Sequence, residues 1–277
     1  MKILIRGAGD IATGIALRLY RAGMQVVMTD LPAPTAIRRT VCFSQAIILG
    51  EMTVEDVTAR RAETPDQAEA LLAQGLIPVL ADPDCTCRTR LRPDALVDAI
   101  LAKRNLGTKI DDAPIVVGIG PGFTAGEDCH AVVETMRGHT LGRVIYRGSA
   151  LPNTNIPGLI GGYAGERVLR APAEGIFCQK LEIGAVVRAG DVAGEVAGQP
   201  MRCTIDGVLR GILADGTPVF RGMKAGDVDP RCKPEYCTTA SDKALAVGGG
   251  VLEAVLHLHH RNRPAEKQSQ FTGGALL

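Results

Sequence analysis

Regular alternation of short apolar runs with helix-like segments is the feature that most constrains how this chain folds. Up to about residue 165, the strand-like runs "KILIR", "MQVVMTD", "LIPVLAD" and "PIVVGIG" are separated by segments of helical periodicity. Strands that alternate with helices form mainly parallel sheets covered by helices. We therefore expect a Rossmann-like α/β domain at 1–165, with helices at 10–22, 65–75 ("PDQAEALLAQG") and 93–105 ("PDALVDAILAKRN").

After about residue 165 the helical periodicity gives way to short β-type runs rich in glycine. A weak repeat leads twice to "AGDV", once from "EGI" and once from "DGV", which indicates two similar β-units. We expect residues 166–230 to form a small β-rich barrel-sandwich similar to lipoyl and biotinyl domains. The segment between its halves, "GEVAGQPMRC", has no lysine, so the scaffold is expected without a carrier arm.

The last part of the chain predicts one helix and a tail. Residues 231–262 predict a C-terminal helix that is capped by Ser241 and packs on the first domain. Three successive glycines interrupt its pattern at 248–250, and they indicate close packing, a break or the approach of a ligand. Residues 263–277 predict a disordered tail.

Composition excludes several classes of function. The 31 Lys and Arg balance 30 Asp and Glu, so the chain lacks the basic surplus of a nucleic-acid-binding protein. No run approaches 18 apolar residues, and the chain starts directly with a strand-like segment, so we expect a cytoplasmic protein without a membrane partner. Eight cysteines in such a protein are expected to be free thiols. The oligomeric state, including a homo-oligomer, stays open.

A dinucleotide-type glycine fingerprint connects the first strand to the first helix. Gly7, Gly9 and Ala12 match G-x-G-x-x-G/A, in which glycines allow a pyrophosphate to approach the helix N-terminus. Asp30 ends the second strand, where a carboxylate could hold a ribose hydroxyl. The pattern predicts a site for a nucleotide or a nucleotide-like phosphate, and the alternative is a tight turn that binds nothing.

Asp10 stands at the mouth of this turn, where its charge would repel a phosphate. Three interpretations remain open for it. Asp10 caps an empty helix, or points outward beside a ligand, or faces a cation or a reacting group next to the ligand.

A second glycine loop follows the fourth strand in "VVGIGPGFTAGEDCHAVVET". Gly118, Gly120 and Gly122 are expected to contribute to a ligand site, because open α/β sheets bind ligands beyond the C-terminal ends of their strands. If a helix starts directly after this loop, Cys129 lies in its first turn, where the dipole and the neighbouring His130 favour the thiolate. Cys129, His130 and Asp10 are therefore candidate catalytic residues.

Two further cysteines lie in the loop after the third strand. Cys85 and Cys87 form a C-x-C pair, which supplies half of a tetrahedral zinc site. Cys129 with His130, or Cys232 with Cys237, would have to supply the other half. Whether a metal binds is unknown from the sequence, and ordinary loop cysteines are the alternative.

Several long motifs together resemble one family over essentially the whole folded chain. They are "RGAGDIATGIALRLYRAG", "GEMTVEDVTAR", "VDAILAKRNLGT", "GPGFTAGEDCHAVVET", "GDVDPR" and "SDKALAVGGGVLEA". This set resembles the YqeB family of selenium-dependent molybdenum hydroxylase system proteins. The resemblance implies an accessory role in maturing selenium-dependent molybdenum hydroxylases, together with other cofactor-maturation proteins. Some relatives carry a preceding module similar to the XdhC family, so without it the cofactor is expected to pass to a separate partner.

From this resemblance, the first glycine turn is expected to hold the phosphates of molybdenum cofactor or its dinucleotide. Cys129, or Cys85 and Cys87, would relay selenium or sulfur, because a thiolate is the nucleophile of such a transfer. Two alternatives stay open. In an NAD-dependent oxidoreductase, Asp30 would select NAD and His130 would donate a proton. The other alternative is a non-catalytic chaperone of the apo-hydroxylase.

Overall fold

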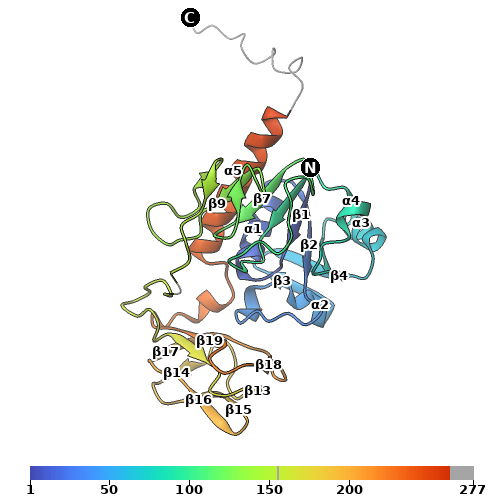
Figure 1. The fold of residues 1–277 in the computed structure, drawn as a ribbon. Helices are drawn as coiled ribbons and strands as arrows, with labels where there is room; N and C mark the ends of the chain where they lie inside the picture. Colours follow the sequence, from blue (N-terminus) through green and yellow to red (C-terminus); the bar gives the residue numbers. More distant parts are fainter. Residues whose placement is uncertain (155, 263–277) are drawn as a thin grey trace, which may run out of the picture.

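A computed structural model describes residues 1–154 and 156–262, which form a larger α/β unit and a smaller β unit (Figure 1). The larger unit contains a nine-stranded sheet in the order β10-β9-β7-β6-β1-β2-β5-β4-β3. Its strands are β1 (Lys2–Arg6), β2 (Gln25–Asp30), β3 (Glu51–Val54), β4 (Val57–Ala62), β5 (Ile77–Ala81), β6 (Ala95–Asp98), β7 (Val116–Ile119), β9 (Ala131–Val133) and β10 (Val144–Ile145). The sheet is parallel except at its edges, where β3 and β10 run antiparallel to their neighbours. This confirms the expected α/β fold class.

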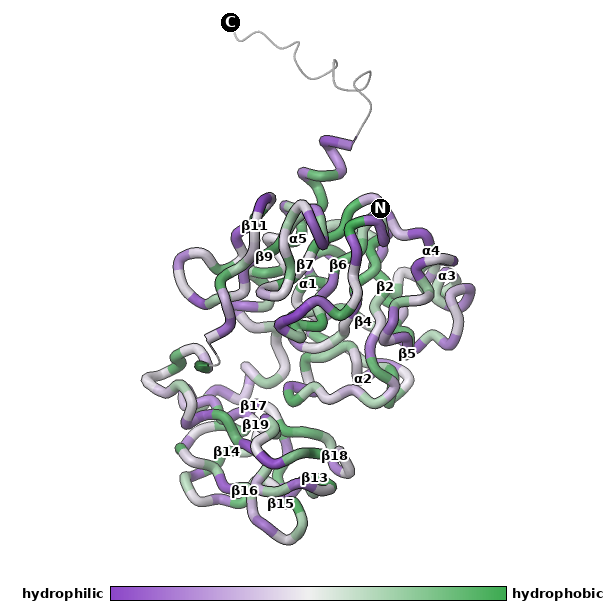
Figure 2. Tube along the Cα trace, in the orientation of Figure 1, coloured by the Kyte–Doolittle hydropathy of each residue, from purple (hydrophilic) through white to green (hydrophobic). Residues whose placement is uncertain are grey.

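Helices cover both faces of the sheet. On one face, α1 (Asp10–Arg21), α2 (Gln45–Leu49) and the C-terminal helix α5 (Asp242–Arg261) contribute to one hydrophobic cluster, while α3 (Pro65–Ala73) and α4 (Arg88–Leu91) contribute to the cluster on the other face. Strand residues alternate between the two clusters, as the geometry of a strand requires. Figure 2 shows the hydrophobic residues gathered on the central strands and α5, with hydrophilic residues more frequent on the connections. No helix of the described ranges is long and apolar enough to cross a membrane.

The helix expected at 93–105 is wrong. Residues Ala95–Asp98 form β6, which pairs in parallel with β1 on one side and β7 on the other. A strand buried on both faces reads as a continuous apolar run and lacks the alternation of a surface strand, so its sequence is easily taken for a helix. Leu101 and Lys103 then adopt left-handed backbone angles, with φ of 62° and 63°, in place of helical ones.

The expected C-terminal helix is present, and its glycines do not break it. Ser241 accepts a hydrogen bond from Ala244 N at 3.2 Å and caps α5, as expected. A Cβ at Gly248 would lie 2.8 Å from Gly14 O in α1, and a Cβ at Gly250 would collide with the backbone of Gly142. Close packing is therefore the interpretation that explains Gly248 and Gly250.

The smaller unit consists of two four-stranded antiparallel sheets, as expected for a β-rich second part. Its strands are β12 (Val168–Arg170), β13 (Gly175–Gln179), β14 (Val186–Val187), β15 (Val192–Val196), β16 (Gln199–Arg202), β17 (Gly207–Ile212), β18 (Pro218–Val219) and β19 (Lys224–Asp229). Two short strands, β8 (Thr124–Ala125) and β11 (Gly148–Ser149), pair in the larger unit, and the 3-10 helices are η1 (Arg39–Val41) and η2 (Pro234–Cys237). The domain boundaries stay a prediction, and the tail at 263–277 lies outside the described residues.

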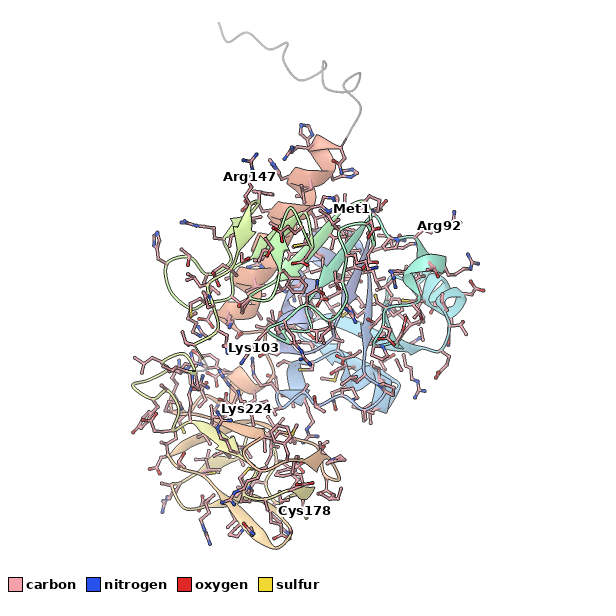
Figure 3. The ribbon with its side chains drawn as sticks, in the orientation of Figure 1. Met1, Arg92, Lys103, Arg147, Cys178 and Lys224 are labelled. Atoms are coloured by element: carbon pink, nitrogen blue, oxygen red, sulfur yellow. The ribbon has the colours of Figure 1, made fainter. Side chains whose placement is uncertain are left out.

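The smaller unit docks against the C-terminal ends of the parallel strands. Ile212 N donates to Ile37 O at 2.7 Å, and Arg39 donates to Ile212 O at 3.0 Å and to Gln179 Oε1 at 2.8 Å. In Figure 3, Met1 at the start of β1 lies far from this junction, whereas Lys103 and Lys224 lie at it. Loops that follow the strands therefore face the second unit.

Candidate functional site

The first glycine turn connects β1 to α1 at the junction of the two units. Gly7 adopts φ of 107°, and a Cβ there would lie 2.9 Å from Ala99 O, so this position requires glycine. Gly9 is the N-cap of α1 and provides no side-chain cap, and a Cβ on it would meet nothing within 4 Å. The first N–H groups of α1 lack intrahelical acceptors, and there is free space beside Gly9.

Asp30, the predicted ribose ligand, binds the glycine turn itself. Its carboxylate accepts hydrogen bonds from Ala8 N at 2.8 Å and Leu31 N at 2.7 Å. Burial raises the pKa of this carboxyl, and the two backbone donors oppose that shift. Asp30 thus holds the turn in place, and its predicted contact with a ribose stays a prediction.

Asp10 forms an ion pair with an arginine of the chain itself, and the predicted ligand beside it stays a prediction. Its Oδ2 accepts a hydrogen bond from Arg38 Nη1 at 2.8 Å. The other end of this buried guanidinium donates to Tyr236 O at 2.9 Å and Thr239 O at 3.3 Å. Arg38 therefore joins the start of α1 to the segment that leads into α5.

Within the described part of the chain, three buried polar atoms in or beside this ion pair have no hydrogen-bond partner. Among the described residues, four buried side-chain polar atoms have no hydrogen-bond partner, and three of them are Asp10 Oδ1, Arg38 Nε and Ser44 Oγ. Ser44 belongs here because its N–H donates to Ala8 O in the glycine turn at 2.9 Å. A buried polar atom without a partner costs about 1–3 kcal/mol, so such atoms call for a ligand or an ordered water.

Two helix N-termini meet at this place. A Cβ at Gly14 would lie 2.5 Å from Ala244 Cβ, and one at Gly248 would lie 2.8 Å from Arg18 Cγ. Four residues further along α1, the contact is thus with a residue four further along α5. The two helices are therefore parallel, with both N-termini directed at the junction. Each N-terminus contributes roughly half a positive charge through its dipole.

Two lysines add full positive charges. Lys224 starts β19 of the smaller unit, and Lys243 lies in the first turn of α5. Burial is the main cause that lowers the pKa of each, and the Asp10 carboxylate acts on both in the opposite direction. Within the part of the chain that the structure describes, neither lysine forms a salt bridge. The arrangement at the start of α1 is therefore suited to bind an anion.

The second glycine loop is packed against protein. A Cβ at Gly118 would lie 2.5 Å from the Phe123 ring, and one at Gly120 would lie 2.7 Å from Thr135 Oγ1. At Gly122, it would lie 2.6 Å from the backbone of Arg104. Packing thus accounts for all three glycines, and their predicted role in cofactor binding stays a prediction.

A β-bridge and strand β9 follow this loop, so the condition under which Cys129 would lie in the first turn of a helix is not met. Cys129 forms a β-bridge with Ala125, and His130 directly precedes β9. Burial raises the pKa of the Cys129 thiol to about 11 and lowers the pKa of His130, whose Nδ1 accepts from Val116 N at 3.0 Å. The helix dipole that favoured a thiolate is therefore missing.

The three candidate catalytic residues do not come together. His130 is level with Val116, at the start of β7, whereas Asp10 follows the C-terminal end of β1. Three strand positions in the sheet, at roughly 4.8 Å each, also separate β9 from β1. Cys129 and His130 are thus remote from the glycine turn that carries Asp10.

Cys85 and Cys87 lie next to each other after β5, buried on the face of the sheet that α3 covers. The interaction between the two side chains lowers the pKa of Cys85 and raises that of Cys87. Among the residues at 1–154 and 156–262, no group of three or more His, Cys, Asp or Glu side chains is arranged to hold a metal ion. The pair has no third ligand in this part of the chain.

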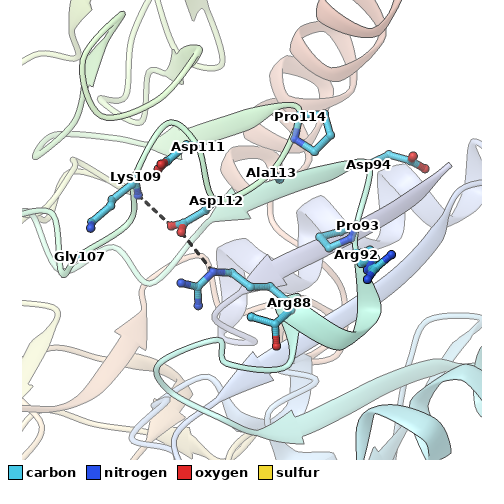
Figure 4. Close-up of a pocket in the computed structure, with 11 residues that line it drawn as sticks. Arg88, Arg92, Pro93, Asp94, Gly107, Lys109, Asp111, Asp112, Ala113 and Pro114 are labelled. Atoms are coloured by element: carbon cyan, nitrogen blue, oxygen red, sulfur yellow. Dashed lines mark hydrogen bonds and ion pairs between the residues drawn. The ribbon is translucent and has the colours of Figure 1, made fainter.

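A cavity of about 810 Å³ opens elsewhere, beside the starts of β6 and β7 (Figure 4). Its lining includes Arg88, Lys109 and Asp112, and Asp112 accepts from Arg88 Nε at 3.1 Å and from Lys109 N at 2.9 Å. Open α/β sheets bind ligands at the C-terminal ends of their strands, which is the opposite edge. The junction therefore remains the better candidate, and this cavity supplies control positions.

Sequence reasoning missed the charged and polar side chains that complete the junction site: Arg38, Ser44, Lys224 and Lys243. The signals available were the Arg-Arg pair in "TAIRRT" and the lysine directly after the Ser-Asp cap in "SDKALAV". Both lie outside the glycine motifs, so neither indicated a ligand site.

The chain is 52% identical over 266 residues to a protein from Escherichia coli (strain K12) described as "Uncharacterized protein YqeB". The match covers 96% of this chain and 49% of that protein, so the chain spans about half the length of this relative. No protein-family model matches the chain.

Solved structures show weaker likeness. A succinylglutamate desuccinylase/aspartoacylase from Rhodobacter sphaeroides is 26% identical, over 23% of this chain and 22% of that one, with a TM-score of 0.20. The ectoine utilization protein EutE (DoeB) from Ruegeria pomeroyi is 21% identical, over 30% of this chain and 28% of that one, with a TM-score of 0.22. These values are too low to carry any argument.

Proposed function

The chain is a close homologue of YqeB, and from this premise we propose that it is an accessory factor in the maturation of selenium-dependent molybdenum hydroxylases. In this role it binds a phosphate-bearing cofactor, either molybdenum cofactor or its dinucleotide, at the start of α1. The resemblance of its motifs to that family supports the role, and the chemistry of the junction supports the kind of ligand.

The observation that carries the ligand proposal is the set of unsatisfied groups around Gly9. Arg38 Nε can donate to a phosphate oxygen, and Ser44 Oγ can donate as well. Lys224 and Lys243 lie near Asp10 without ion-pair partners among the described residues, and the side of the turn at Gly9 is open. A phosphate at this place would supply acceptors for these donors, although not a donor for Asp10 Oδ1.

The residues present fit a phosphate more clearly than they fit a nucleoside. Asp30 already accepts two backbone N–H groups, so a ribose hydroxyl would have to displace one of them or share an oxygen. The bound cofactor would supply the molybdenum chemistry of the hydroxylase, whereas this chain would hold its phosphate and exclude water around it.

Among the predicted relay cysteines, Cys85 has the lowered pKa and Cys129 a raised one, so a relay of selenium or sulfur is assigned to Cys85.

Native mass spectrometry of protein purified from a host that makes molybdenum cofactor tests this proposal. We expect a bound pterin phosphate or pterin dinucleotide that is retained in Lys109→Met and lost or strongly reduced in Lys243→Met. The two substitutions remove the same charge, but Lys109 lines the cavity at the opposite edge of the sheet.

Other results would overturn the proposal in distinguishable ways. Bound NAD would favour the oxidoreductase. Loss of the ligand in Lys109→Met with retention in Lys243→Met would move the site to the 810 Å³ cavity. A ligand-free protein that still binds the apo-hydroxylase in a pull-down would leave the non-catalytic chaperone.

A further inference from the structure

A second polar site lies on the other face of the sheet, behind the glycine turn. Leu4 and Leu96 point into the hydrophobic cluster that α3 covers, and side chains two residues further along a strand share that face. Arg6 at the end of β1 and Asp98 at the end of β6 therefore lie on this face, as does Thr29 of β2. Their strands are neighbours in the sheet, so these polar groups gather at one place.

The loop after β5 brings Cys85 and Cys87 to the same place. The Asp82 carboxylate accepts from Cys87 N at 2.7 Å and from Thr86 Oγ1 at 3.0 Å, which fixes the loop. Cys85 adopts φ of 56°, a left-handed conformation that costs energy for a residue with a side chain. Residues held in such conformations cluster at functional sites, where the surroundings maintain them.

Three groups favour the thiolate of Cys85. The side chains of Cys87 and Thr29 both act to lower its pKa. Thr29 is fully buried, and within the described residues its Oγ1 has no hydrogen-bond partner. The Arg6 guanidinium adds a positive charge nearby, and together these groups lower the pKa of Cys85.

A small cavity of about 160 Å³ leads to Cys85 and does not touch Cys87. Its lining includes two arginines, Arg6 and Arg88, and the hydroxyl-bearing Thr108. A volume of this size holds several waters and admits small inorganic molecules.

We propose that Cys85 and Cys87 form a reactive dithiol that reduces small inorganic molecules with a chalcogen–chalcogen bond, such as hydrogen peroxide or hydrogen disulfide. Cys85 attacks from the cavity, and Cys87 resolves the product. This reactivity is independent of the phosphate site on the other face of the sheet.

The two steps balance for an electrophile HX–XH, where X is oxygen or sulfur. The Cys85 thiolate attacks one X, the X–X bond breaks, and the departing HX⁻ takes up a proton to leave as H₂X. This leaves Cys85–S–XH. The Cys87 thiol then attacks the Cys85 sulfur, the S–X bond breaks, and a second H₂X leaves with the Cys87 proton. The result is a Cys85–Cys87 disulfide, and the electrophile has been reduced by two electrons.

Mass spectrometry of the full chain tests this with hydrogen peroxide and, separately, sodium disulfide. We expect the loss of two hydrogen masses, located by digestion to a peptide that links Cys85 to Cys87. In Cys87→Ser the first product should accumulate, and dimedone should trap it on Cys85 after peroxide. In Cys85→Ser this chemistry at the pair should disappear.

Two matched controls make the result decisive. Cys129→Ser removes another buried thiol of the same cluster, one whose pKa is raised, and should leave the disulfide unchanged. Cys232→Ser removes an exposed thiol and should also leave it unchanged. The proposal is overturned if the pair stays reduced while Cys232 is oxidised, or if Cys87 reacts equally well in Cys85→Ser.

Discussion

The Asp10–Arg38 pair supports a quantitative prediction about how the junction is held together. Arg38→Met removes a guanidinium whose side chain is 6% exposed, whereas that of Asp10 is 27% exposed. Breaking a buried ion pair by removing one partner costs about 3–5 kcal/mol, and the partial exposure of Asp10 places this pair at or below the lower end. The substitution also leaves the carbonyls of Tyr236 and Thr239 without a donor, at about 1 kcal/mol each.

The ion pair and the two carbonyls lose the same side chain, so their three costs add to somewhat less than their sum. We therefore expect Arg38→Met to lower the free energy of unfolding by about 4 kcal/mol. For a chain of this size that corresponds to a fall in melting temperature of roughly 8–10 °C. Equilibrium denaturation and differential scanning calorimetry measure the two quantities. A loss below about 1 kcal/mol would show that the pair behaves like an ordinary surface salt bridge.

A double-mutant cycle with Asp10→Asn separates the ion pair from a simple interaction of Asp10 with the helix dipole. If Arg38 and Asp10 act on each other, the two substitutions should show a coupling of about 1–3 kcal/mol. Arg39→Met is the matched control, because Arg39 donates to Ile212 and Gln179 and not to Asp10. Additive effects in both cycles would refute the pairing and leave Asp10 as an acid in the first turn of α1 that interacts with the helix dipole alone.

Three further results are expected. Binding of inorganic pyrophosphate, measured by calorimetry, should weaken with rising pH already below the ordinary lysine value of 10.5. Burial lowers the pKa of both Lys224 and Lys243, and only the protonated lysines attract the anion, so Lys243→Met should reduce this pH dependence and Lys224→Met with Lys243→Met should flatten it. Gly248→Ala should destabilise the protein by about 1–3 kcal/mol through overpacking against α1, whereas Gly249→Ala, whose Cβ would meet nothing within 4 Å, should stabilise it by up to about 1 kcal/mol in urea denaturation. Arg210→Met should cost about 3–5 kcal/mol by leaving the buried Asp227 with one cation fewer, and hydrogen exchange should show this first in the smaller unit.

Local signals made much of the fold predictable. The strand that ends at Arg6, the glycine turn and the helix from Asp10 follow from neighbouring residues, and the cap at Ser241 does as well. The helix expected at 93–105 failed because the sequence does not reveal that Ala95–Asp98 is enclosed by two parallel strands. Pairing with those neighbours outweighs local helix propensity.

The candidate site was less predictable than the fold, because its parts come from separate segments of the chain. Arg38 and Ser44 follow β2, Lys224 belongs to the smaller unit, and Lys243 starts α5. No spacing in the sequence relates these residues. Contacts inside the larger unit bring Arg38, Ser44 and Lys243 to the glycine turn, and the docking of the smaller unit adds Lys224. The Cys129 hypothesis depended on a helix that the chain does not form there, and burial without a helix dipole raises the thiol pKa instead.

Asp10, the acid at the mouth of the glycine turn, has an equivalent in Asp242 at the start of α5. Both parallel helices begin with an aspartate, and each aspartate binds an arginine from a distant segment: Asp10 binds Arg38 at 2.8 Å, and Asp242 binds Arg137 at 2.8 Å. Because each carboxylate is compensated by its own guanidinium, it repels an incoming anion far less than an isolated charge would. The helix dipoles add positive potential, as do Lys224 and Lys243, which form no salt bridge among the described residues, so an acidic residue in the turn is compatible with binding a phosphate.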